Sequence, residues 1–282
     1  MSKMKIKQAF HETLSQKLPR LQTSTTTRDA ISMLKSSRWN ALCVESPATG
    51  HSKESEERRR PLAVSKYSIL SNLINTQPAH YDRFMDSPCS ESALLIGSAS
   101  ENDDIVSLLH VFESSTLGYS AIVNAEHKLI GLLSIVDVLQ LYENNIFTSD
   151  LFIGDVASSP IFGLRPETPL RKAVNAMVTR KFRRILIEGT KKIVSDSDII
   201  DFLFEVDESK KVKFLSNKLL DGNLSDVRSQ EPPTIRPNEP IASVAKIIAD
   251  AYHNCLLTDS SITTPWDIVL KPWRLGRLRI AE

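Results

Sequence analysis

Glycine, cysteine and long apolar runs are scarce in this sequence of 282 residues, and each scarcity argues against a class of protein. Only 9 glycines occur, and none of them forms a glycine-rich phosphate-binding loop. The three cysteines, Cys43, Cys89 and Cys255, are too far apart for a zinc-binding spacing or a disulfide framework. No apolar stretch reaches roughly 18 residues, so we expect no membrane span.

Signals for export, catalysis and metal binding are also missing. The opening stretch MSKMKIKQAF lacks the apolar core of a secretory signal, and together with the scattered cysteines it favours a reducing, cytoplasmic location. No G-x-S-x-G or H-E-x-x-H motif occurs, and the six histidines are scattered. A net charge of +1 gives no overall field that would attract nucleic acid or an acidic membrane. We therefore predict a protein that is not an enzyme and requires no metal or cofactor.

One pattern is repeated, and it organises the whole chain. An apolar run, a Ser or Thr, two residues, an Asp and a second apolar run occur three times, with a period of roughly 65 residues. One period before the first of these, the same shape recurs with Ser65 and with Ser68 in place of the Asp. The three complete motifs are Ser134 to Asp137, Ser195 to Asp198, and Thr264 to Asp267.

The segments before these motifs are repeated too. RPETPLRKAVNAM and RPNEPIASVAKII share an Arg-Pro-x-x-Pro start followed by helical apolar spacing. Pro169 and Pro240 suit the first helical turn, with Thr168 and Glu239 at or beside the cap. A short strand, a turn, the strand that carries the Ser or Thr, and a second helix near the Asp follow. Each unit is therefore predicted as strand, helix, strand, strand, helix, in an α/β (α+β) fold.

The sequence gives the limits of these units only approximately, because their borders are loops. Cys43 and Cys255 lie in apolar strand-like runs and are expected in the core. A polar loop at 46–60 interrupts the first repeat. The predicted repeats are residues 15–78, 86–146, 152–206 and 222–275, followed by a tail at 276–282.

Four such units, three of them with the [ST]-x-x-D motif, resemble CBS (cystathionine-β-synthase) domains over roughly residues 15–275. The resemblance implies two tandem pairs, called Bateman modules, that form a disk-like assembly as a monomer or a homodimer. A chain of four CBS repeats is similar to stand-alone archaeal CBS proteins. It is also similar in layout to the gamma subunit of AMP-activated protein kinase.

The motif residues suit a nucleotide. A carboxylate accepts hydrogen bonds through two oxygens, so it can hold both hydroxyls of a ribose, and a helix N-terminus favours a phosphate. The resemblance implies this ribose role for Ser134, Asp137, Ser195, Asp198, Thr264 and Asp267. The same spacing also fits a helix capping box, in which the side chains only satisfy backbone amides. The sequence leaves both interpretations open.

Cations near the third and fourth motifs would hold the phosphates. Arg183 and Arg184 precede a strand of the third repeat, and Arg forms a planar fork that suits phosphate. In the fourth repeat, His253 is aligned with Arg183, and Asn254 with Arg184. The first two repeats have no cation there, so the pair of repeats 3 and 4 is predicted to be the better nucleotide module. The alternative is that these are exposed strand-edge charges and a satisfied histidine.

The predicted function is regulatory sensing of an adenine nucleotide (AMP, ADP or ATP) in clefts between paired repeats, with signalling to an unidentified protein partner. The first alternative is a CBS scaffold that binds a partner protein and no ligand. The second is nucleic-acid binding by the basic tail KPWRLGRLRIAE, although nucleic acid is not the expected partner. The alternating residues after Gly276 also suit an added edge strand.

Overall fold

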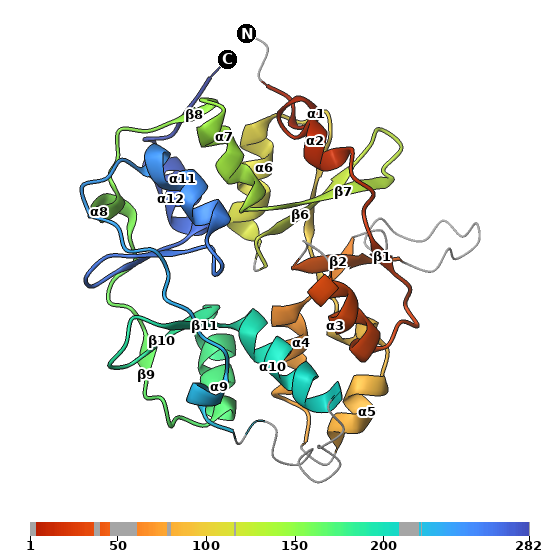
Figure 1. The fold of residues 1–282 in the computed structure, drawn as a ribbon. Coiled ribbons are helices and arrows are strands. Elements are labelled where there is room, and N and C mark those ends of the chain that lie inside the picture. Colours follow the sequence, from red (N-terminus) through yellow and green to blue (C-terminus); the bar gives the residue numbers. More distant parts are fainter. Residues whose placement is uncertain are drawn as a thin grey trace. The chain divides into compact units, whose positions relative to one another are not determined.

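The computed structural model describes residues 4–36, 40–45, 61–77, 80–115, 117–208, 220 and 222–281. The predicted loop at 46–60 and the last tail residue lie outside these. The chain divides into two compact units, and alternate repeats share a unit (Figure 1). Unit 1 comprises Met1–Leu18, Gly97–Ile161 and Glu231–Glu282, and unit 2 comprises Pro19–Ile96 and Phe162–Gln230.

Unit 2 combines the first and third repeats, and each has a small sheet with helices beside it. The sheet orders are β1-β2-β3-β4 and β11-β10-β9. In both, the first strand of the repeat pairs in parallel with the second, which forms an antiparallel hairpin with the third. The elements are β1 (Arg20–Leu21), α3 (Thr27–Ser36), β2 (Ala41–Val44), β3 (Leu62–Ser65), α4 (Lys66–Leu73), α5 (Tyr81–Asp86), η3 (Cys89–Ser92), β4 (Leu94–Leu95), β9 (Gly163–Leu164), α9 (Leu170–Arg180), β10 (Arg184–Ile187), β11 (Ile193–Ser195), α10 (Asp196–Glu208) and η6 (Leu224–Asp226).

Unit 1 combines the second and fourth repeats. Its sheets are β5-β6-β7, β12-β13 and β14-β8. The elements are α1 (Ile6–Ala9), α2 (His11–Leu14), β5 (Gly97–Ser100), α6 (Ile105–Ser114), β6 (Tyr119–Val123), β7 (Leu129–Ser134), η4 (Asp137–Leu139), α7 (Gln140–Glu143), β8 (Phe147–Thr148), α8 (Ile153–Val156), α11 (Ile241–Asp250), β12 (Leu256–Leu257), β13 (Ile262–Thr263), α12 (Pro265–Arg274) and β14 (Arg279–Ile280).

The predicted order of strand, helix, strand, strand, helix is confirmed in the first three repeats. In the fourth, the first strand is reduced to a single parallel bridge between Thr234 and Leu257. The predicted edge strand of the tail is confirmed, because β14 pairs antiparallel with β8. No helix in the described part of the chain is long and apolar enough to span a membrane.

The two Arg-Pro-x-x-Pro segments begin their helices one residue later than predicted. Pro169 and Pro240 are the N-caps of α9 and α11, with an extended ψ of 139° in both cases, and they do not lie in the first turn. The reason is a contact with a distant segment. Each proline forms an isolated bridge, and the next amide donates to a remote carbonyl: Leu170 N to Gly222 O, and Ile241 N to Leu151 O.

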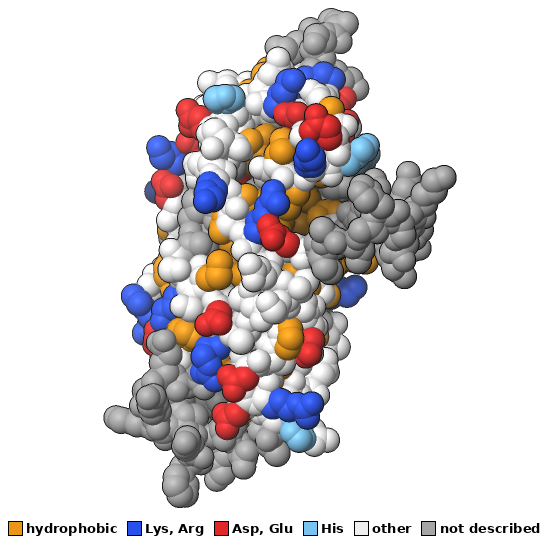
Figure 2. Space-filling model, turned by 90° about the vertical axis from the view of Figure 1, so that its right-hand side faces the viewer, with side chains coloured by type: hydrophobic (Ala, Val, Ile, Leu, Met, Phe, Trp, Pro, Cys, Tyr) orange, Lys and Arg blue, Asp and Glu red, His pale blue; other side chains and the backbone are white. Residues whose placement is uncertain are grey.

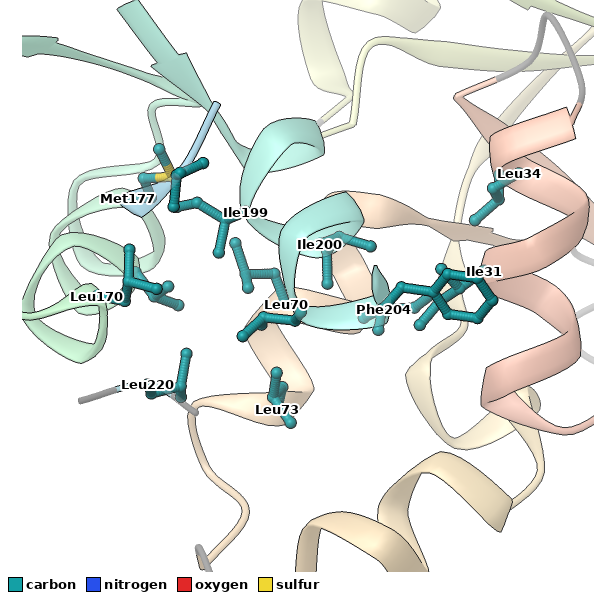
Figure 3. Packing of buried hydrophobic residues seen from close by; sticks show 14 of the residues in the cluster. Ile31, Leu34, Leu70, Leu73, Leu170, Met177, Ile199, Ile200, Phe204 and Leu220 are labelled. Atoms are coloured by element: carbon teal, nitrogen blue, oxygen red, sulfur yellow. The ribbon is translucent and has the colours of Figure 1, made fainter. Parts of the chain in front are cut away.

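The core of unit 2 forms where the second helices of two repeats meet. Helix α10 of the third repeat packs against α4 and α3 of the first. Since α10 buries apolar residues on successive turns, it contributes to one cluster shared by both repeats. Figure 3 shows this cluster, including Ile31 and Leu34 of α3, Leu70 and Leu73 of α4, Leu170 and Met177 of α9, and Ile199, Ile200 and Phe204 of α10.

Unit 1 is built in the same way from the second and fourth repeats. Helix α11 packs on α7 and α12, and its buried face joins a second apolar cluster. Within it, the buried Tyr142 hydroxyl donates to the Ile268 carbonyl at 2.6 Å, and burial raises the pKa of Tyr142. The expectation that Cys43 and Cys255 are core residues is confirmed. Burial raises the pKa of the Cys43 thiol to about 12, so this thiol is protonated and unreactive at neutral pH.

Candidate functional site

The third motif lies where a strand ends and a helix begins. Ser195 is the last residue of β11, and α10 starts at Asp196. Oδ2 of Asp198 accepts from the Ser195 amide at 2.7 Å and from the Ser195 hydroxyl at 2.6 Å. In return, the Asp198 amide donates to Ser195 Oγ at 3.3 Å. This is a reciprocal capping box, and Asp198 is only 3% exposed.

The second and fourth motifs have the same geometry. Asp137 Oδ2 accepts from the amide and hydroxyl of Ser134, both at 2.7 Å. Asp267 Oδ2 accepts from the amide and hydroxyl of Thr264, both at 2.8 Å. In all three repeats, one carboxylate oxygen is therefore turned back onto the start of its own helix. The capping interpretation correctly describes these local contacts.

The first repeat has this cap without a carboxylate. The Ser65 amide donates to Ser68 Oγ at 2.9 Å, and the Ser68 amide donates to Ser65 Oγ at 3.0 Å. A serine hydroxyl can accept the same backbone bond, so losing the Asp does not lose the cap. The cap alone thus does not require the carboxylate that the other three repeats have.

The carboxylate of Asp267 has further partners. Its Oδ1 accepts from the Ser158 hydroxyl at 2.8 Å and from the Lys271 ammonium at 2.8 Å. Oδ2 already accepts two hydrogen bonds from Thr264. A carboxylate offers about four lone-pair positions, so contacts within the chain use the full accepting capacity of Asp267.

Two arginines lie at the start of the hairpin of the third repeat, and they have different surroundings. Nη2 and Nε of Arg183 contact Oδ2 of the buried Asp196 at 2.7 and 2.8 Å, and the guanidinium lies 5.8 Å from the centre of the Tyr67 ring. Arg184 is half-buried and is paired with Ser195 in the register of β10 and β11. Residues directly opposite on paired strands point to the same face, so Arg184 lies beside the Ser195 and Asp198 pair.

Strand register corrects the predicted alignment of the fourth repeat. Register pairs Arg184 with Ser195, and it pairs Leu256 with Thr263. Extending the second register by one residue pairs Cys255 with Thr264, so Cys255 is the counterpart of Arg184.

Asn254 is then the counterpart of Arg183, and the alignment of His253 with Arg183 was wrong by one residue. Asn254 has a φ of 45°, and its side-chain amide donates to the Ile248 and Ala249 carbonyls at the end of α11. His253 is 5% exposed, with its ring against that of Tyr252 at 4.8 Å. Sequence alone places an element boundary only to within roughly two to four residues, which is enough to cause this slip.

Sequence reasoning missed Ser158 and Lys271. A signal existed for Lys271, because it lies four residues after Asp267 and such pairs meet on one helix face. In the sequence it reads as part of the basic tail. For Ser158 there was no signal, because its contact with Asp267 joins positions 109 residues apart in the chain.

Most cations of the basic segment 271–282 form ion pairs or hydrogen bonds within unit 1. The Arg274 Nε donates to Glu113 at 2.9 Å, and Arg277 forms a two-point pair with Asp150. On the face drawn in Figure 2, acidic and basic side chains of the described residues alternate and form no single-sign area. This surface gives little support to nucleic-acid binding. Among the described residues, no cluster of three His, Cys, Asp or Glu side chains could hold a metal ion.

Comparison with known proteins assigns the fold. Residues 153–205 match the family model of the CBS domain, so the third repeat is a CBS domain. No curated protein matches the sequence. The fold is similar to that of a Methanocaldococcus jannaschii protein described as a proposed archaeal homologue of g-AMPK, with 17% identity, a TM-score of 0.73, and coverage of 91% of this chain and 96% of that chain.

Two further structures are similar to this chain, one over almost its whole length and one over less than half of it. An uncharacterised conserved protein from Pyrococcus horikoshii has 13% identity and a TM-score of 0.51, with 95% of this chain and 99% of that chain covered. A CBS domain protein from Pyrobaculum aerophilum in complex with AMP has 20% identity and a TM-score of 0.35, with 44% and 86% covered. The latter likeness is too low to assign a ligand to this chain. Together with the family match, the fold is that of tandem CBS repeats.

Proposed function

We propose that this protein is a regulatory sensor that binds an adenosine nucleotide, AMP, ADP or ATP, in clefts between paired CBS repeats and transmits its occupancy to a protein partner. The supporting observation is in the third repeat, where Arg184, Ser195 and Asp198 lie together at one end of a hairpin and at the start of α10. Similarity in fold to a proposed g-AMPK homologue agrees with this role.

Each residue of this group has a role in the proposal. The cap fixes the orientation of the Asp198 carboxylate, and this carboxylate accepts the ribose hydroxyls. Arg184 supplies a guanidinium for the phosphates. Asp196, in the first turn of α10, would repel a phosphate at this helix N-terminus, and its pair with Arg183 neutralises that charge. Arg183 thus acts through Asp196.

The remaining motif residues are proposed as secondary sites. In the second repeat, Ser134 and Asp137 form the same cap, but the counterpart of Arg184 is Tyr119, which carries no charge. In the fourth repeat, Thr264 and Asp267 form the cap. His253 is buried and precedes this cap in the sequence. The counterpart of Arg184 there is the uncharged Cys255, so we propose weaker binding in the fourth repeat than in the third.

Regulation follows if the nucleotide binds one arrangement of the repeats better than another, because a ligand shifts the populations of two arrangements only when its affinities for them differ. The partner is a protein that reads this shift. We propose that the chain acts in the cytoplasm, as a monomer or homodimer, and that neither catalysis nor a bound cofactor is part of its role.

Thermal unfolding with AMP, ADP and ATP tests the proposal. At about 100 times Kd, a ligand that binds only the folded protein adds about 2.7 kcal/mol of stability, which raises the melting temperature. Asp198→Asn should remove most of this shift, whereas the exposed control Asp259→Asn should retain it. A shift that is equal in wild type and Asp198→Asn would refute the assignment of the third repeat.

A ligand-free scaffold is a second candidate, and two observations favour it. The first repeat keeps its cap without any carboxylate, and the carboxylate of Asp267 has its accepting capacity filled by the chain. Flat melting curves with all three nucleotides would favour this alternative.

A further inference from the structure

The segment Val156–Ser158 connects the second repeat to the third. It begins at the last residue of α8, and it precedes the point where the chain leaves unit 1 after Ile161 and enters unit 2 at Phe162. Ser158 exchanges two backbone hydrogen bonds with Ile262, at 2.8 and 3.0 Å. These two hydrogen bonds attach the segment to the β12–β13 hairpin of the fourth repeat.

Side chains of α12 hold the same segment. The Lys271 ammonium donates to the Val156 carbonyl, to Ser158 Oγ at 3.1 Å and to Asp267 Oδ1 at 2.8 Å. Ser158 Oγ in turn donates to Asp267 Oδ1 at 2.8 Å. The Asp267 side chain is 7% exposed and that of Lys271 is 36% exposed.

Donors and acceptors balance in this group. An ammonium has three N–H groups, and Lys271 has three acceptors. The carboxylate of Asp267 likewise accepts four hydrogen bonds, two on each oxygen. Any ligand hydroxyl that uses Oδ1 must therefore displace Ser158 or Lys271, and it thereby weakens the hold on the connection.

We propose that Asp267, Ser158 and Lys271 form a clasp that holds Val156–Ser158 on α12, and that a nucleotide taking the Asp267 carboxylate opens it. The first statement concerns the ligand-free protein, and the second rests on the proposed function. Lys271 is a positioning residue and an internal competitor for the fourth motif. Occupancy of that motif would free the stretch of chain through which one unit continues into the other.

Hydrogen exchange of the ligand-free full chain tests the clasp. Because the Lys271 ammonium donates charge-assisted hydrogen bonds to this segment, Lys271→Met should speed exchange of the Ala157 and Ser158 amides by about tenfold or more. Lys246→Met, an exposed lysine of α11, is the matched control and should leave both amides unchanged. Ser158→Ala is a second, milder variant and should change exchange in the same direction. Unchanged exchange in both clasp variants overturns the clasp.

Titration with AMP tests the coupling. If the clasp competes with the ligand, Lys271→Met should raise the affinity of the weaker, fourth-repeat site for AMP by about tenfold. Adding Asp267→Asn should remove that gain. AMP should also speed exchange of the Ser158 amide in the wild type. An affinity that does not rise in Lys271→Met overturns the coupling. If no variant binds AMP, ADP or ATP, the proposed function and the coupling both fail, whereas the exchange result still decides the clasp.

Discussion

The second helices of the third and fourth repeats begin with the same cap but have different surroundings. In both, an Asp in the first turn of the helix accepts from the amide and hydroxyl of a Ser or Thr three residues earlier. In the third repeat, Arg184 lies opposite Ser195 across the hairpin. In the fourth, the aligned residue is Cys255, and Ser158 and Lys271 bind the carboxylate of Asp267.

This difference separates what the motif does from what its neighbours do. The spacing of Ser or Thr and Asp is sufficient for the cap, which is why all three complete motifs form it and Ser65 with Ser68 imitates it. Suitability for a nucleotide depends instead on cations from the hairpin and on residues far away in sequence. We therefore propose that the same four-residue pattern is a ligand site in the third repeat and part of a clasp in the fourth.

The largest expected effect compares the two aspartates directly. Asp267→Ala removes the cap and leaves the Lys271 ammonium without its carboxylate, so we expect a loss of about 3 kcal/mol in the free energy of unfolding. Asp198→Ala removes the corresponding cap of α10, which by itself contributes about 1–2 kcal/mol. Urea unfolding of both variants measures the difference. Equal losses would show that the clasp adds nothing to the stability of the fourth repeat.

The helices also differ in how they hold the partner repeat of their unit. Lys66 of α4 contacts both carboxylate oxygens of Asp201 on α10 at 2.8 Å, whereas α12 accepts a hydrogen bond from Tyr142 and forms a more exposed ion pair between Arg274 and Glu113. The Lys66 side chain is 7% exposed and that of Asp201 is 25% exposed. Lys66→Met should cost about 2 kcal/mol, because it leaves a partly buried carboxylate unpaired.

A double variant provides the control for this ion pair. Lys66→Met with Asp201→Leu should recover at least half of the loss, since replacing both charges by apolar groups avoids the unpaired charge. Chemical denaturation of the single and double variants gives the coupling between the two residues. Additive losses would mean that the pair does not join the two repeats.

A smaller effect comes from the residue before each motif. It is aliphatic in the first three repeats but is Thr263 in the fourth, where the buried hydroxyl has no hydrogen-bond partner within the described residues. Thr263→Val keeps the shape and removes the unsatisfied hydroxyl, so stability should rise by about 1 kcal/mol. The reverse change in the third repeat, Val194→Thr, should lower it by a similar amount. Thermal melting checks both, and a loss in Thr263→Val would mean that the hydroxyl is satisfied in solution.

The smallest expected effect on stability concerns the tail after α12, which has no counterpart in the third repeat. The hydrogen bond from Arg277 lowers the pKa of Asp150 below its ordinary value of 3.8. A carboxylate with a lowered pKa in the folded state stabilises above its unfolded pKa, and this contribution disappears as the pH falls through the folded pKa. Wild type should therefore melt slightly above Arg277→Gln at pH 7, and the difference should shrink as the pH falls below 3.8. A difference that persists in acid would contradict this cause.

Local and periodic features of the fold could be predicted from the sequence, and contacts between distant segments could not. Apolar spacing predicted the helices and hairpins, because burial of one face repeats within a few residues. The cap at Asp198 was one of two open interpretations. The partners of Asp267 were not predictable, since Ser158 lies far away in the chain. It was also not predictable that alternate repeats share a core, because the four repeats have similar sequence patterns and none indicates which other repeat it packs against.

Calorimetric titration of AMP into the wild-type full chain, Asp198→Asn and Asp267→Asn tests the central claim most directly. If the third repeat carries the main nucleotide site and the fourth is held closed by its own lysine, Asp198→Asn should weaken binding by about tenfold or more. Asp267→Asn should then change the main affinity little. Binding that survives in Asp198→Asn but is lost in Asp267→Asn would contradict the account.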